Sequence, residues 1–147
     1  MSKLRVTYRW DPAMKVHRSS LWTKRMVYVL IANRAIKYLN GRSRVIYIGT
    51  TKRGERRPAS SAASKSIQAF AELRGVKWTE VHLLSSERRP NTETWRLLES
   101  ALLIVFRSLY GKLPYFNKRL DDFRKLEQVD DYFRSKNLIK ILRGFER

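Results

Sequence analysis

The fold depends most on the stretch Arg44-Val45-Ile46-Tyr47-Ile48-Gly49-Thr50. Its β-branched and aromatic residues, closed by a glycine, predict a strand of about five residues. A second run of the same character spans residues 26–33, and Asn40-Gly41 between the two runs is a strong signal for a chain reversal. We therefore expect an antiparallel hairpin that brings Tyr28 and Tyr47 into one small region.

The middle of the chain predicts a helix, a third strand and a second helix. Residues 59–73 follow a proline that suits a helix start, and their apolar side chains recur at helical spacing (Ala63, Ile67, Phe70, Ala71). Residues 78–84 alternate in polarity, which is typical of a strand. Asn91 or Thr92 is a suitable cap for a second helix, which should end at Gly111. Its wide apolar stripe indicates that it is mostly buried.

The two ends of the chain predict further elements. Residues 4–10 alternate at the period of a strand, and the segment before residue 26 could be an edge strand or an arm that reaches along a phosphate backbone. Residues 121–133 return to helical spacing, and residues 137–142 suggest a last short turn. The predicted fold class is α/β in the broad sense (α+β), with a small three-stranded antiparallel core sheet flanked by helices. An N-terminal strand and C-terminal helices are added to it, within a single domain over residues 1–147.

The amino-acid composition favours some classes of partner and excludes some classes of metal site. The chain has 32 Lys and Arg against 13 Asp and Glu, a formal net charge of +19. Such an excess repels itself in a compact state and usually serves a polyanionic partner, with nucleic acid favoured because Lys and Arg release counterions from phosphates. The cations are spread along the whole chain, which argues against a membrane-surface helix. There are no cysteines and only two histidines, so thiolate and histidine metal sites are excluded. With no long apolar run, the expected location is the cytoplasm, or the nucleoid in a prokaryote.

A set of motifs in fixed order resembles the GIY-YIG nuclease family. Val27-Tyr28-Val29 stands at the place of the first motif, without its glycine, and Tyr47-Ile48-Gly49 matches the second in full. Glu99 matches the glutamate on the family's helix, and Asn117 matches the asparagine that ends its core. The resemblance covers residues 26–118, which leaves an N-terminal extension over 1–25 and a C-terminal helical extension over 119–147.

The resemblance implies a catalytic site made of Tyr28, Tyr47, Arg57, Glu99 and Asn117. Glu99 would hold one Mg²⁺ or Mn²⁺, hard cations that prefer oxygen ligands. The tyrosines would surround the attacking water, and which of them takes its proton is left open. The family spacing from Tyr47 leads to Arg57, whose guanidinium would bind phosphate oxygens. The chain departs from the family where Pro58 follows that arginine and where Ser61 replaces a frequent His or Tyr.

Several cations and aromatic residues have competing interpretations. Arg53 and Arg56 rival Arg57 for the phosphate position, while Lys52, Arg53, Arg56 and Lys65 are predicted nucleic-acid contacts. The same cationic field would lower the pKa of the tyrosines, which at its ordinary value of about 10 makes them poor bases. Trp10, Trp22 and Tyr8 could stack on bases, although lone tryptophans more often pack in a core.

These observations favour a metal-dependent DNA endonuclease that hydrolyses phosphodiester bonds, of restriction type or phage type. The alternative is a catalytically inactive, basic nucleic-acid-binding module of the same fold, favoured by the departures near Arg57 and the missing glycine. A basic RNA-associated protein is a third hypothesis, which a preference for RNA over DNA at matched salt would support. The expected partner is DNA, no membrane is expected, and a homodimer is left open.

Overall fold

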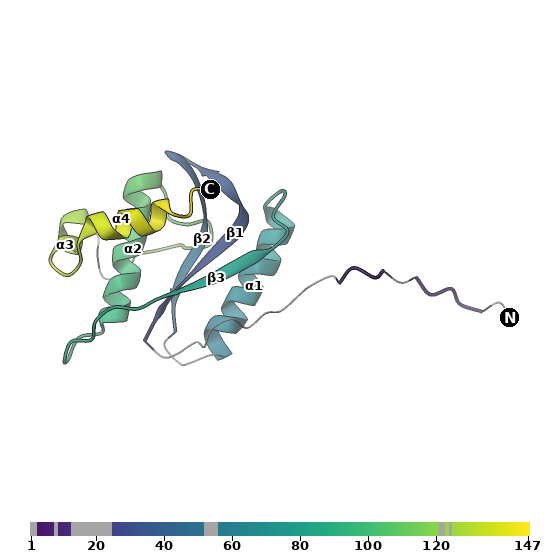
Figure 1. Ribbon diagram of the computed structural model, residues 1–147, viewed down its shortest axis with the longest axis horizontal. Coiled ribbons are helices and arrows are strands. Elements are labelled where there is room, and N and C mark those ends of the chain that lie inside the picture. The colour runs from purple at the N-terminus through teal and green to yellow at the C-terminus, as the bar shows by residue number, and fades with distance from the viewer. Residues whose placement is uncertain (1–2, 8, 13–24, 52–55, 121–122, 124) are drawn as a thin grey trace.

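A computed structural model of the protein describes residues 3–7, 9–12, 25–51, 56–120, 123 and 125–147, and of residues 56–58 it describes the backbone alone. It has the predicted α+β architecture: a three-stranded antiparallel sheet with helices on both of its faces (Figure 1). The elements are β1 (Val27–Tyr38), β2 (Gly41–Thr50), α1 (Arg56–Glu72), β3 (Thr79–Leu84), α2 (Thr94–Tyr110), α3 (Leu126–Asp130) and α4 (Ser135–Arg143).

The sheet has the order β2-β1-β3, so the predicted hairpin forms its first two strands. Tyr38 pairs with Gly41 across the reversal, and at the other end of the hairpin Tyr28 pairs with Gly49. Gly41 has a φ of 119°, which a residue with a Cβ rarely adopts. β1 is longer than expected because the segment after residue 33 continues the hairpin, with a shift of register between Ile31 and Ile36.

Alternation along β1 divides the interior into two packed layers. Val27, Val29 and Ile31 face the larger core, where they meet α2 and α4. Tyr28, Leu30 and Ala32 face the opposite side of the sheet, where α1 lies (Figure 1). The C-terminal segment belongs to the larger layer: Leu138 and Leu142 of α4 are buried in the same cluster as the apolar face of α2. One face of the sheet therefore carries the main core, and the other carries both tyrosines.

The predicted N-terminal strand is wrong. Residues 3–7 and 9–12 carry no strand, and they lie apart from the sheet and helices (Figure 1). Leu4 is 96% exposed and Trp10 is 90% exposed, so Trp10 is not a core residue. Alternation alone does not make a strand, because the backbone groups of a strand need a partner strand. Trp22 and Tyr8 lie outside the described residues.

Three helix predictions need correction in detail. α2 begins at Thr94 with Glu93 as its N-cap residue, so neither Asn91 nor Thr92 caps it; its end at Gly111, in the left-handed conformation, is confirmed. In the described part of residues 121–133, the helix covers only Leu126–Asp130. The expected last turn is instead a full helix, α4, whose apolar residues lie on one face.

α1 begins two residues before Pro58, and its buried face differs from the apolar spacing in the sequence. Ala62 and Ala69 are buried against the sheet, whereas Ile67 is 61% exposed and Phe70 is 41% exposed. Small residues let the helix approach the strands closely, which leaves the larger side chains on its outer surface. Along the described residues, no helix is both long and apolar enough to cross a membrane.

Candidate active site

The two tyrosines of the resemblance lie together on the face of the sheet that α1 covers. Tyr28 extends from β1 and Tyr47 from β2, and their ring centroids are 5.7 Å apart with planes inclined by 50°. The hairpin register makes this meeting possible, because Tyr28 pairs with Gly49 and Leu30 with Tyr47. The predicted convergence of the two phenols is confirmed.

The missing side chain at Gly49 leaves space for the rings of both Tyr28 and Tyr47. Residues 47 and 49 point to the same face of β2, because side chains alternate along a strand. A Cβ at Gly49 would lie 2.8 Å from the Cζ and Oη atoms of Tyr28 and 2.8 Å from Cε1 of Tyr47. Real Cβ atoms essentially never make such contacts. The absence of a side chain at this position therefore allows the tyrosines to sit side by side.

Tyr28 is held in its neutral form. It is only 2% exposed, and this burial is the main reason that its pKa is raised well above the ordinary value. A hydrogen bond from Ser61 opposes the rise, while Tyr47, as hydrogen-bond partner and as neighbouring phenol, and the charge of Glu99 add to it. The expectation of a pKa lowered by cations is therefore wrong for Tyr28, because the loss of water around the ring outweighs the other influences.

Glu99 reaches the same region from the other layer of the protein. It lies in the second turn of α2 and is half-buried, next to the buried Ser100. Its charge acts on the Tyr28 phenol. A carboxylate is a suitable ligand for a hard divalent cation such as Mg²⁺, which keeps several waters and binds substrate phosphate as well. No cluster of three or more His, Cys, Asp or Glu occurs within the described ranges.

Lys65, a predicted nucleic-acid contact, lies against Tyr47 and Ser61. Its Nζ lies 4.1 Å from the centroid of the Tyr47 ring and donates a hydrogen bond of 3.0 Å to Oγ of Ser61, one turn earlier on α1. Partial burial lowers the pKa of Lys65, and the positive charge of Lys118 lowers it further. Ser61 was noted in the sequence only as a departure from the family. The spacing of four residues on a helix is the one signal that could have linked it to Lys65.

Asn117 braces the strand that carries Tyr47. Its Oδ1 accepts a hydrogen bond of 2.9 Å from the Ile48 N–H, and its Nδ2 donates one of 2.8 Å to the Ile48 carbonyl. β2 is an edge strand, so these two backbone groups point away from β1 and would otherwise have no strand to pair with. The side chain of Asn117 therefore satisfies the outward-facing backbone groups of β2 at Ile48.

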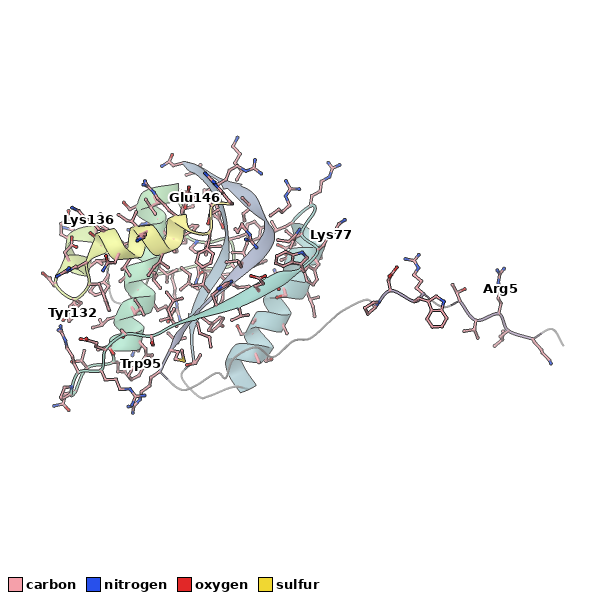
Figure 2. The ribbon with its side chains drawn as sticks, in the orientation of Figure 1. Arg5, Lys77, Trp95, Tyr132, Lys136 and Glu146 are labelled. Atoms are coloured by element: carbon pink, nitrogen blue, oxygen red, sulfur yellow. The ribbon has the colours of Figure 1, made fainter. Side chains whose placement is uncertain are left out.

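The predicted cations are only partly described. Lys52 and Arg53 lie outside the described residues. Arg56 and Arg57 lie in the first turn of α1, with Arg57 one helical turn before Ser61. Elsewhere the positive charge is widely spread: Lys77 precedes β3 near the end of α1, and Lys136 lies on α4 at the other side of the molecule (Figure 2).

The comparisons with known proteins add no relative. No protein-family model, no curated protein and no solved structure matches the chain. The functional interpretation therefore depends on the geometry of the tyrosine pair, Glu99, Lys65 and Asn117.

Proposed function

We propose that the protein is a metal-dependent endonuclease that hydrolyses DNA phosphodiester bonds at a GIY-YIG-type site. The observation that carries the proposal is the convergence of Tyr28, Tyr47 and Glu99 from three different elements, in a chain with a net charge of +19. A buried phenol, a half-buried phenol and a half-buried acid are costly to bring together, so such a group is a candidate for chemistry rather than for packing alone.

Each group has a task that fits phosphodiester hydrolysis. The phenols provide oxygen atoms that can orient a water molecule, and one of them would accept its proton. The Glu99 carboxylate would hold one Mg²⁺ or Mn²⁺, which when bound supplies positive charge for the phosphate oxygens and the departing oxygen. Arg57 is the proposed phosphate-binding guanidinium, because it lies on α1 one turn before a residue that contacts Tyr28.

Plasmid cleavage in the presence of Mg²⁺ or Mn²⁺ tests this function. Glu99→Gln keeps the shape of the side chain and removes its charge, and it should slow cleavage by at least about 100-fold. Glu93→Gln is the matched control on the same helix, because Glu93 is exposed and pairs with Arg96 at 2.8 Å. It should cleave like the wild type. Equal cleavage by wild type and Glu99→Gln would refute the proposal, as would no wild-type cleavage of supercoiled, linear and branched DNA.

A non-catalytic nucleic-acid-binding module is the second candidate. It is supported by the serine at position 61, where the family often has a His or Tyr, and by the deep burial of Tyr28. It predicts binding that weakens steeply with salt and does not depend on a divalent metal. Metal-dependent turnover of any DNA substrate would rule it out.

A further inference from the structure

Two residues of α1 connect the tyrosine pair to a positive charge. The Lys65 ammonium donates a hydrogen bond of 3.0 Å to Oγ of Ser61, and it lies over the Tyr47 ring at 4.1 Å. Ser61 in turn is hydrogen-bonded to the Tyr28 hydroxyl, and Tyr28 is hydrogen-bonded to Tyr47. The four side chains therefore form one continuous chain of hydrogen bonds.

This chain has a direction. An ammonium group only donates, so Ser61 accepts from Lys65 and has its single hydroxyl proton left to donate to Tyr28. Tyr28, which accepts from Ser61, then donates its own proton to the Tyr47 oxygen. Every donor in the chain points toward that oxygen, and the Lys65 charge lies over the same ring. Both effects favour negative charge on Tyr47 rather than on Tyr28.

Exposure separates the two tyrosines in the same way. Tyr28 is 2% exposed and enclosed by the smaller core, whereas Tyr47 is half-buried. Two other charged groups act on this cluster: Glu99 from α2 acts on Tyr28, and Lys118 acts on Lys65. Tyr47 is therefore the phenol of the pair that a solvent water can reach.

We propose that Lys65 is a positioning residue that acts through Ser61 and Tyr28 to make Tyr47 the acceptor of the proton from the attacking water. This inference rests on the proposed nuclease function and deepens it. Before attack, Tyr47 releases its proton to solvent. The water then gives a proton to the Tyr47 oxygen while its own oxygen forms the new bond to phosphorus. The bridging P–O bond breaks, and the departing oxygen takes up a proton from solvent.

The first test compares the pH dependence of kcat for wild type, Lys65→Met and Lys65→Arg. Loss of the cation should move the rising limb of the profile to higher pH by about one unit, which is roughly a tenfold loss of kcat near neutral pH. Lys65→Arg keeps a positive charge over the Tyr47 ring and should bring the rising limb most of the way back to its wild-type pH. Lys118→Met is the matched control, since it removes a nearby positive charge that acts on Lys65, whereas the cation over the Tyr47 ring and at Ser61 is Lys65 itself, and it should leave the limb in place.

A second test separates positioning from phosphate binding. DNA affinity of Lys65→Met should stay within about twofold of wild type, with an unchanged salt dependence. A lysine that contacts phosphate would instead reduce the slope of log K against log salt by about 1. An unmoved pH limb together with weaker, less salt-dependent binding would overturn the inference.

A third measurement does not depend on cleavage. With ¹³C-labelled tyrosine, the Cζ signals of Tyr28 and Tyr47 should move in Ser61→Ala and Lys65→Met and stay in place in Lys118→Met. Unmoved signals would refute the hydrogen-bond chain itself. If the signals move in these variants but the wild type cleaves no DNA, the nuclease function and the proton transfer are refuted while the hydrogen-bond chain stands. The two failures are therefore distinguishable.

Discussion

Gly49→Ala is the substitution that most directly tests the geometry of the tyrosine pair. The new Cβ would lie 2.8 Å from atoms of both rings, about 0.6 Å inside the 3.4 Å at which ordinary contacts begin. No positive φ is involved, so the effect comes from crowding rather than from the backbone. Tyr28 is enclosed by the core, so the half-buried Tyr47 is the ring that must move away.

The expected effect on catalysis exceeds the effect on stability. Crowding of this kind costs about 1–3 kcal/mol in the free energy of unfolding, measured by urea denaturation. A displaced reacting group loses about 100-fold in rate for a misplacement of about 1 Å, so cleavage should fall by roughly that factor. Gly144→Ala is the control, because Gly144 ends α4 in a right-handed conformation, far along the chain from the pair. Wild-type cleavage by folded Gly49→Ala would refute the argument that the close approach of the two rings matters.

Two further predictions concern stability. Asn117→Ala removes both hydrogen bonds to the Ile48 backbone and should lower the free energy of unfolding in urea by about 1–3 kcal/mol, whereas Asn137→Ala, an exposed change on α4, should have almost no effect. Burial and its hydrogen bond to Glu146 raise the pKa of Tyr110 to about 12, so the folded state holds this proton more tightly than the unfolded chain does. The stabilisation is complete below pH 10 and is lost between pH 10 and 12, by roughly 2 kcal/mol. Tyr110→Phe should flatten this alkaline decline, and an unchanged slope would contradict the assignment.

The sequence predicted the tyrosine pair because its position follows from local rules. Strand character, a reversal signal at Asn40-Gly41 and the alternation of side chains together fix which residues share a face. The prediction for α2 succeeded for a similar reason, since its long apolar stripe has only one way to be buried. In both cases the apolar residues follow a clear period, which favours one secondary structure over the others.

The failures occur where the partner of a segment decides the outcome. Residues 4–10 have strand periodicity, but the sheet provides them with no neighbour. On α1, the small residues Ala62 and Ala69 are buried while Ile67 and Phe70 are exposed. The helix approaches the sheet closely through its small residues, and this leaves the larger apolar side chains on its outer surface. The contact of Lys65 with Tyr47 was also hidden, because a lysine in a cationic chain is indistinguishable in sequence from its exposed neighbours.

The precision of the candidate site comes from residues that need supply no chemistry. Tyr47 belongs to an edge strand, and such strands are the least constrained part of a sheet. At Ile48 the side chain is anchored in the main core, and the backbone N–H and carbonyl are both bound by Asn117. At the next residue, Gly49 admits the Tyr28 ring. The anchoring of Ile48 and the missing side chain at Gly49 thus fix the position of the Tyr47 phenol and the ring that it contacts. Loss of the Asn117 brace should therefore reduce cleavage by more than the measured loss of stability accounts for, under conditions where the variant remains fully folded.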